Sequence, residues 1–341
     1  MKRAFAAVLA VCILLCGCTA WKSGAPKPFN AVYLTLFDTV TTILGTAESE
    51  EQFRRAAQEI YEELETYHRL FDIYHDYEGL NNLKTVNDRA GGAPVKVDSA
   101  LIELLLQCKA YYDLTDGKVN AAMGSVLKLW HEARTEGLED PENARLPDGE
   151  ALRLAAEHIN MDCVVIDAEA STVQITDPQL SLDVGAIAKG WACQKAAASA
   201  PKGFLISLGG NVCVTGAKDA QGNPWVIGIQ HPERSDEYLY TLHAVSGSVV
   251  TSGDYQRVYR VDGKAYHHII DPDTQMPSAY WRSVTVVCGD SALADALSTA
   301  LFLLPLEEGR ALAERNHAQA LWVGADGTEH MTSGFRALIA N

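Results

Sequence analysis

The sequence holds 341 residues, of which 48% are hydrophobic and 21% are charged, so the chain can bury a sizeable core and a disordered protein is excluded. Its formal net charge of −16 becomes −18 without residues 1–17, which carry two basic and no acidic side chains. Because a strongly acidic chain repels phosphate backbones, nucleic acid is not expected as a partner.

The N-terminal segment has the features of an export signal. Two basic residues precede an apolar run that ends at Leu15 and is shorter than the roughly 20 residues that a membrane-spanning helix needs. The run closes on Leu15-Cys16-Gly17-Cys18, which resembles the bacterial lipobox. We therefore expect residues 1–17 to be a lipoprotein signal peptide, Cys18 to be lipidated and residues 18–30 to be a tether. An ordinary cleaved secretion signal is the alternative.

Lipidation at Cys18 would fix the location of the protein. Acyl chains contribute about 0.8 kcal/mol per buried CH₂, so two or three of them hold a protein firmly on a membrane. We expect an exported protein anchored to the outer face of the cytoplasmic membrane, or to a periplasmic membrane face. Five further cysteines follow without CxxC spacing, and we expect them to be buried thiols. One disulfide among them is the alternative.

Hydrophobic periodicity predicts the elements of the N-terminal half. Two strands come first, at Ala31–Phe37 and Val40–Gly45. A long helix follows, and residues at spacings of three and four form its inward face: Phe53, Ala57, Ile60, Leu64 and Tyr67. A second helix covers Ser99–Tyr112, with Asp98 or Ser99 placed to cap it. Residues 136–149 are polar and contain two prolines, which indicates a surface excursion.

The C-terminal half consists of short β-rich runs followed by two helices. The expected strands are Cys163–Asp167, Thr172–Thr176, Phe204–Leu208, Val212–Thr215, Trp225–Gln230, Tyr238–His243, Ser248–Thr251 and Ser283–Cys288. Helices at Ser291–Leu304 and Pro305–Asn316 precede a final strand at Ala318–Val323. This order predicts an α+β fold with a mostly antiparallel sheet flanked by helices.

The segment from Ser181 to Gly190 is the first with groups suited to ligand binding. We interpret it as a strand that ends at the carboxylate of Asp183, passes two glycines and opens a helix at Trp191. Such a turn points backbone N–H groups outward, where they hold phosphate groups or the edge of an adenine. The motif is neither GxGxxG nor a P-loop, so a buried connection with a solvated Lys189 is an equal alternative.

A second segment concentrates polar side chains within about the length of one hairpin, over residues 251–257 and 263–272. His267 and His268 are adjacent, so on a strand they would face opposite sides and could not chelate one metal together. We therefore disfavour a zinc site and interpret one histidine as an acid–base or hydrogen-bonding group. A plain polar hairpin is the alternative.

The helix expected at residues 291–304 carries a third polar group. Asp295, Ser298 and Thr299 are spaced so that their oxygens share one face of an otherwise apolar helix. An unpaired carboxylate is costly to bury there, which argues that a cation meets it. Oxygen ligands favour Mg²⁺, which completes its shell with water and phosphate oxygens. The alternative is a capped aspartate, with the two hydroxyls bonded to helix carbonyls.

Together these segments resemble the ApbE family, FAD:protein FMN transferases that are often bacterial lipoproteins. The resemblance runs from about Tyr33 to the C-terminus, and its motifs are Asp183–Gly190, Leu208-Gly209-Gly210-Asn211, Trp225–Pro232, Ser252-Gly253-Asp254-Tyr255-Gln256-Arg257, His268–Pro272 and Ala294-Asp295-Ala296 with Thr299. It implies an ApbE-like, T-fold-like architecture for residues 31–341. It also implies transfer of FMN from FAD to a Thr or Ser hydroxyl of an acceptor protein, with Mg²⁺ as cofactor and AMP as product.

The resemblance assigns roles by position. The Mg²⁺ ligands would be the carbonyl oxygen of Ala186, the side chains of Asp295 and Thr299 and, as an open choice, that of Ser298. The residues that would contact FAD are Phe37, Tyr74, Lys118, Val119, Asn120, Asp183, Lys189, Ser252, Gly253, Asp254 and Ile270. His268 would take the proton of the attacking hydroxyl, with Asp271 as the alternative base, and Asp295 would also be essential for catalysis.

The chain departs from the family pattern at four places. Phe37-Asp38-Thr39 stands where the family has Met-Gly-Thr, and Val119-Asn120 stands where Phe-Asp is usual. Gln275 replaces the glycine of the Asp-Pro-x-Thr-Gly run, and the loop at Gly79–Asn87 is reduced. These changes touch cofactor contacts and loop shape, so we expect them to alter affinity or target choice more than the reaction.

Other functions stay open at this point. They are a flavin-binding lipoprotein that does not transfer FMN, a metal-dependent FAD pyrophosphatase with water as nucleophile, and a solute-binding or structural lipoprotein. The enzyme interpretation requires the turn at residues 183–189 to meet Asp295 and Thr299. It also requires that no lysine or arginine of the chain already neutralises Asp295.

Overall fold

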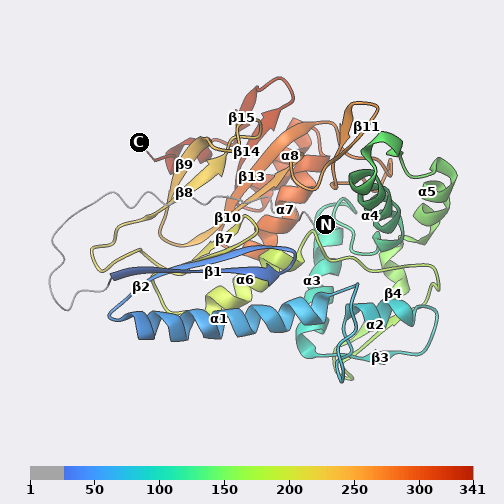
Figure 1. Cartoon of the computed structure of the whole chain (residues 1–341), viewed down its shortest axis with the longest axis horizontal. Coiled ribbons are helices and arrows are strands. Elements are labelled where there is room, and N and C mark those ends of the chain that lie inside the picture. Colours follow the sequence, from blue (N-terminus) through green and yellow to red (C-terminus); the bar gives the residue numbers. More distant parts are fainter. Residues whose placement is uncertain (1–26, 341) are drawn as a thin grey trace.

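The computed structural model describes residues 27–340 (Figure 1). The expected signal peptide and Cys18 lie outside the described residues. Part of the expected tether is regular structure, because the first strand, β1, begins at Lys27, which pairs with Ala47 of the next strand. Residues 27–30 therefore belong to the folded domain, four residues earlier than the boundary we expected.

One large antiparallel sheet organises the molecule, and it confirms the expected α+β class. Its eight strands run in the order β1-β2-β6-β7-β10-β13-β14-β15. Their bounds are β1 (Lys27–Leu36), β2 (Thr39–Ala47), β6 (Phe204–Leu208), β7 (Asn211–Val214), β10 (Gly247–Gly253), β13 (Trp281–Cys288), β14 (Gln319–Gly324) and β15 (Glu329–Met331). The prediction that the strand now labelled β14 would be the last was wrong, since β15 pairs with it as the edge of the sheet.

Three smaller antiparallel units accompany this sheet. The first has the order β3-β5-β4, and the others are the pairs β8–β9 and β11–β12. Their strands are β3 (Val95–Lys96), β4 (Val164–Asp167), β5 (Thr172–Ile175), β8 (Trp225–Gln230), β9 (Tyr238–Ala244), β11 (Tyr259–Val261) and β12 (Lys264–Tyr266).

Eight α-helices and four 3₁₀ segments lie within residues 27–340. The helices are α1 (Glu50–Phe71), α2 (Leu83–Asp88), α3 (Ser99–Leu114), α4 (Gly124–Glu139), α5 (Gly149–Ala155), α6 (Ala188–Ser199), α7 (Ser291–Leu303) and α8 (Leu306–Arg315), and the 3₁₀ segments are η1 (Pro141–Asn143), η2 (Ala156–His158), η3 (Met161–Cys163) and η4 (Phe335–Leu338). In the described part of the chain no helix combines the length and apolar character that crossing a bilayer requires.

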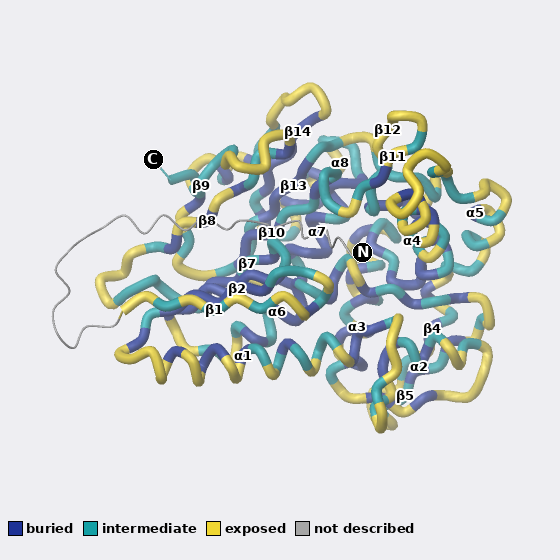
Figure 2. Tube along the Cα trace, in the orientation of Figure 1, coloured by how far each residue is buried: buried dark blue, intermediate teal, exposed yellow. Residues whose placement is uncertain are grey.

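The two faces of the large sheet are covered differently. Helix α1 packs its apolar stripe, including Phe53 and Ile60, onto β1, β2 and β6 together with α6. The β8–β9 pair covers part of the opposite face through Trp225 and Ile227. Helix α7 is buried on nearly all sides between α6, β10 and β13, as the dark blue core in Figure 2 shows. This buried helix is the one that carries Asp295.

Candidate functional site

The contact between α6 and α7 is the centre of the candidate site. Asp295 on α7 is only 4% exposed, and its Oδ2 accepts a hydrogen bond from the backbone N–H of Gly190 on α6 at 2.7 Å. The helices come so close that a Cβ on Gly190 would lie 2.3 Å from the carbonyl oxygen of Ser291 and 2.4 Å from Cβ of Asp295. Glycine is therefore required at this position by the close approach of the two helices.

The Asp295 carboxyl is buried without an ion-pair partner. Burial raises its pKa, and the nearby charge of Lys189 together with the hydrogen bond from Gly190 opposes the rise. No lysine or arginine of residues 27–340 lies within ion-pair distance of it. The Asn211 amide nitrogen itself is buried and makes no hydrogen bond of ordinary geometry within the described residues. This corner therefore holds a carboxylate and an amide that are not fully satisfied by the protein.

The turn before α6 differs in shape from the expected strand-to-helix turn, but it contains the carbonyl oxygen of Ala186 that we expected at the site. Ser181 forms an isolated bridge with Met123 rather than a strand, and the helix begins at Ala188 instead of Trp191. The Gly190 N–H belongs to the first turn of α6, whose donors have no partner inside the helix, and Asp295 accepts its hydrogen bond. The Ala186 carbonyl oxygen lies just before this helix, and no hydrogen bond within residues 27–340 reaches it. The Asp183 side chain accepts from the N–H of Gly185, which shapes the turn.

The two hydroxyls of α7 differ in availability. The Ser298 hydroxyl is fully buried and lies 2.8 Å from that of Ser252 on β10, and it donates to the carbonyl oxygen of Asp295 at 2.9 Å. Thr299 is partly exposed, and its hydroxyl makes no hydrogen bond with another residue of the described range. Thr299 is therefore the hydroxyl that is free to bind a ligand, whereas Ser298 ties α7 to β10.

The free oxygens at this corner fit a hard cation. They are a carboxylate from Asp295, a hydroxyl from Thr299 and a carbonyl from Ala186, the donor types that Mg²⁺ takes. In the stretch from residue 27 to 340, no three His, Cys, Asp or Glu side chains are grouped so that they could bind a metal. A metal ion held here would therefore depend on substrate phosphate oxygens and water to complete its shell.

His268 has a free ring nitrogen. Both histidines lie beyond β12 rather than on a strand, and their rings have different partners. His267 contacts the carbonyl oxygen of Ser278 through Nε2 at 2.8 Å. His268 uses Nδ1 on the carbonyl oxygen of Gln256 at 3.2 Å, so Nδ1 carries the proton and Nε2 keeps its lone pair.

Cationic neighbours keep the His268 ring neutral. Burial is the first cause that lowers its pKa to about 3, and the charges of Arg257, Lys189 and Arg134 add to the effect. Sequence reasoning did not assign Arg134 or Arg257 to the site. Arg257 stood within a quoted motif, and Arg134 lies on α4, a helix that the hydrophobic pattern did not reveal.

The aromatic residues expected at the flavin are accessible. Tyr74 is 51% exposed, and its ring centroid lies 5.4 Å from that of His131 on α4. Phe37 and Asp38 form a two-residue turn between β1 and β2, both at φ 51°, which is a costly conformation for residues other than glycine. The Phe37 ring packs edge-on against His68 at 5.5 Å. Strained backbone of this kind often marks a ligand site.

The segment from Lys118 to Asn120 is tied to the loop that follows His268. Lys118 pairs with Asp271 at 3.0 Å and with Asp273 at 2.7 Å. The Val119 side chain is buried, and the Asn120 amide donates to the carbonyl oxygen of Ile159. These side chains hold the protein together, so contacts with FAD from this segment would come from the backbone. The same ion pair occupies Asp271, which leaves His268 as the better base.

Three of the remaining expected residues lie at the end of β10, and the fourth, Ile270, lies beyond β12. Ser252 and Gly253 end that strand, and Asp254 follows it. Asp254 forms an ion pair with Arg282 at 2.7 Å, although burial still raises its pKa. Ile270 is buried and pairs with Pro277 in an isolated bridge rather than on a strand. Asp254 is therefore engaged within the protein, and Ile270 belongs to the apolar cluster that includes Trp130 and Tyr259.

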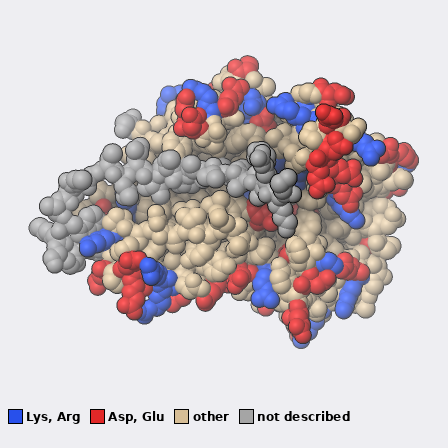
Figure 3. Space-filling view, in the orientation of Figure 1, with Lys and Arg blue, Asp and Glu red and all other residues tan. Residues whose placement is uncertain are grey.

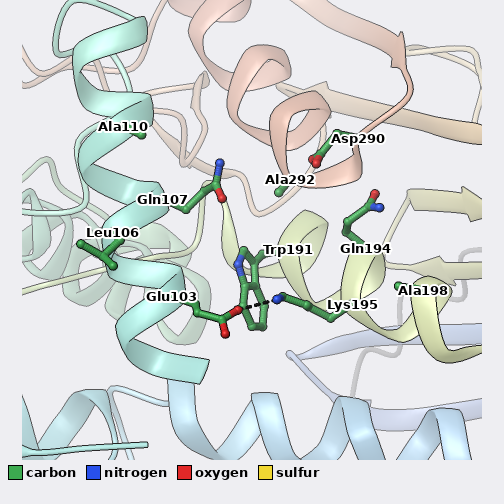
Figure 4. A pocket seen from close by; sticks show the side chains of 10 residues that line it. All are labelled: Glu103, Leu106, Gln107, Ala110, Trp191, Gln194, Lys195, Ala198, Asp290 and Ala292. Carbon is green, nitrogen blue, oxygen red and sulfur yellow. Dashed lines mark hydrogen bonds and ion pairs between the residues drawn. The ribbon is translucent and has the colours of Figure 1, made fainter. Parts of the chain in front are cut away.

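A groove of about 580 Å³ lies on another side of α6 (Figure 4). It runs between α3, α6 and the start of α7, and Lys195 crosses it to pair with Glu103 while its ammonium lies over the Trp191 ring. None of the residues expected at the flavin lines this groove. Asp295, Thr299 and Ala186 do not line this groove either, so the candidate cation site is separate from it.

Comparisons with known proteins agree with one another. The model of the ApbE family matches residues 37–322. The FAD:protein FMN transferase of Treponema pallidum is 34% identical over 281 residues, which cover 76% of each chain, and that of Klebsiella pneumoniae is 32% identical over 75% of this chain and 81% of its own. The crystal structure of the ApbE protein of Thermotoga maritima superposes with a TM-score of 0.81 at 29% identity, over 92% of this chain and all of that one.

Proposed function

The chain belongs to the ApbE family and is a flavin transferase, and from this premise we propose that it moves FMN from FAD to a Thr or Ser hydroxyl of an acceptor protein, with Mg²⁺ as cofactor and AMP as product. The observation that carries the proposal is the α6–α7 contact. It buries a carboxylate without an ion pair against the first turn of α6, and the Ala186 carbonyl oxygen just before that helix accepts no hydrogen bond within residues 27–340.

The cofactor site consists of Asp295, Thr299 and the Ala186 carbonyl oxygen, and Ser298 supports it from behind through Ser252. A bound Mg²⁺ would neutralise phosphate charge, including the charge that develops on the departing AMP. Lys189 adds a positive charge to the same corner, since it opposes the rise in the pKa of Asp295. Tyr74 offers an exposed ring to the flavin or adenine.

His268 takes part in the transfer as the base. Its Nε2 accepts the proton of the acceptor hydroxyl while that oxygen attacks the FMN phosphorus. A new P–O bond to the acceptor forms, the P–O bond to AMP breaks, and its electron pair leaves with the AMP phosphate. The bond from Nδ1 to the carbonyl oxygen of Gln256 keeps the ring in the tautomer that can accept this proton.

We also propose that the protein works outside the cell membrane, held by a lipid on Cys18. Eight residues separate Cys18 from Lys27, where β1 begins. At 3.3–3.6 Å per residue, such a linker reaches at most roughly 29 Å. The anchor would therefore keep the site close to a membrane surface, where acceptor proteins of the same membrane meet it.

One assay tests the proposed reaction. Purified protein, FAD, Mg²⁺ and a small acceptor domain with an exposed threonine are mixed, and the acceptor is examined for flavin fluorescence in a denaturing gel. We expect a fluorescent acceptor and one AMP per label. FAD binding without label would favour a flavin carrier, and AMP release without label would favour a pyrophosphatase. His268→Ala should still bind FAD but label about 10²- to 10⁴-fold more slowly.

A further inference from the structure

Helix α4 is fastened beside the segment that carries His268. The Trp130 indole N–H donates to the carbonyl oxygen of Gln275 at 2.8 Å, and its ring stacks with Tyr266 at 6.2 Å. Tyr266 and Gln275 lie on either side of His268 in the sequence. Arg134 follows Trp130 by one helical turn, so it projects from the same face of α4. The helix therefore holds an arginine next to the proposed base.

His131 fixes that arginine without neutralising it. The Arg134 Nη2 lies 2.8 Å from Nδ1 of His131. A guanidinium can only donate, so the His131 ring accepts this bond and is neutral. The charge of Arg134 and burial both lower the pKa of His131, in agreement with a neutral ring. The same ring lies against Tyr74, which links Arg134 to the exposed aromatic of the site.

Arg257 approaches the site from the other direction. It follows Gln256, whose carbonyl oxygen holds His268, and its φ of 45° is strained for a residue with a side chain. The bond from His268 to Gln256 and the bond from Trp130 to Gln275 place Arg257 and α4 beside the same segment, and the lowering effect of the Arg257 charge on the pKa of both Arg134 and His268 agrees with this placement. Neither arginine forms an ion pair with a carboxylate of residues 27–340, unlike Arg153 and Arg282.

We infer that Arg134 and Arg257 form a cationic clamp for the diphosphate of FAD, and that His131 is the residue that positions Arg134. This inference rests on the proposed function, because it names further groups of the same site. Two neighbouring guanidinium groups without carboxylates repel each other until an anion joins them, and their planar forks match phosphate oxygens. The net charge of −16 gives no overall attraction for FAD, and Figure 3 shows acidic side chains gathered near α4 itself. Local cations must therefore provide it.

Binding measurements without catalysis test the clamp. The affinities of the full-length protein for FAD, riboflavin and ADP are measured by flavin fluorescence and calorimetry, with EDTA and then with Mg²⁺. Arg134→Ala and Arg257→Ala are each expected to weaken FAD and ADP binding by about tenfold or more, and to leave riboflavin binding unchanged. Arg134→Lys should keep part of the affinity. Arg153→Ala, which removes an exposed arginine paired with Glu150 and Glu157, is the matched control.

A double-variant comparison tests the role of His131. If His131 acts through Arg134, His131→Ala weakens FAD binding in the wild type and has no further effect in the Arg134→Ala background. Additive losses would overturn the positioning role.

The outcomes separate the clamp from the reaction. Unchanged FAD affinity in Arg134→Ala and Arg257→Ala, or equal losses for FAD and riboflavin, would overturn the clamp even if the acceptor is labelled. Binding of ADP that depends on Arg134, in a protein that never labels an acceptor, would refute the transfer and support the clamp.

Discussion

The protonation state of His268 is set by its surroundings rather than by the ring itself. An ordinary histidine titrates near 6.5, whereas burial together with Arg257, Lys189 and Arg134 lowers the pKa of His268 to about 3. A lowered pKa means that the neutral ring persists as the pH falls. The free enzyme therefore keeps its proposed base ready in mildly acidic solution.

This gives a prediction about pH. Between pH 7.5 and 5.5, kcat/KM for FAD should change by less than about twofold, whereas a base with the ordinary pKa of 6.5 would lose about tenfold. The measurement is the initial rate of acceptor labelling at subsaturating FAD in a constant ionic strength buffer series. In Arg257→Ala the acid limb should move to higher pH, because one charge that opposes the imidazolium is gone. A midpoint near 6.5 in the wild type would contradict the assignment.

A second prediction concerns the charge on Asp295. Asp295→Asn keeps an oxygen that can accept from Gly190 and removes the negative charge. We expect the melting temperature to stay within a few degrees of the wild type, while Mg²⁺-dependent labelling falls below detection. Asp295→Ala should lose labelling as well. The readout is the labelling rate against Mg²⁺ concentration, and an active variant with an unchanged metal dependence would exclude the proposed role.

At the scale of single residues, the sequence shows candidate ligand atoms but not the partners that engage them in the fold, and the roles of these residues stay predictions. The oxygens of Asp295 and Thr299 are visible as helix spacing, and the structure does set Asp295 against the glycine turn. Residue spacing could not show that Ser298 is engaged by Ser252 or that Lys118 is paired with two aspartates. Those partners are distant in sequence and meet only in the folded chain.

At the level of elements, helix boundaries and tight contacts decide the geometry of the site. Helix α4 was not predicted because Met123 at its N-cap offers no side-chain bond and its apolar face is weakly defined. The helix is nevertheless held in place by tertiary contacts, such as Gly124 against Ser181 and Trp130 against Gln275. The long amphipathic helix α1 was predicted correctly from its clear periodicity, and the structure adds a side-chain cap at Ser49.

The α6–α7 contact yields a prediction about packing. Gly190→Ala would force a Cβ into the Ser291 carbonyl, so the helices must separate, at a cost of about 1–3 kcal/mol. Labelling should fall as well, because the Gly190 N–H moves away from Asp295. Thermal unfolding and labelling rates check both effects. Gly149→Ala is the matched control, since a Cβ there meets nothing within 4 Å and lies in the first turn of α5. Equal stability of both variants would contradict the prediction.

On the scale of the whole molecule, the class of fold was predictable and the strand order was not. Alternating apolar runs with turns between them indicated an antiparallel sheet, and the sheet is antiparallel throughout. Its order places β2 beside β6, more than 150 residues further along the chain, and sequence periodicity carries no information about such pairing. The edge strands β1 and β15 are the ends of this order.

The position of β1 leads to a prediction about truncation. A variant that lacks residues 1–26 should keep the melting temperature of the domain and label acceptors in solution, because it retains the whole of β1, which begins at Lys27. A variant that lacks residues 1–36 removes the edge strand and the buried Leu36, and leaves the turn at Phe37 without support. It should be less stable and bind FAD more weakly. Thermal unfolding and FAD titration compare the two, and equal behaviour would mean that β1 is dispensable.

The bond between Gly190 and Asp295 constrains how this protein can evolve. The Asp295 carboxylate joins two helices and also belongs to the proposed cation site. A substitution that changes the affinity for the cation therefore also weakens the contact between α6 and α7. Descendants that abandon the reaction are therefore expected to retain an oxygen acceptor at position 295 and a glycine at 190. Adaptation to another acceptor or another ion would instead begin at positions such as 299, whose hydroxyl makes no hydrogen bond with another residue in the range 27–340.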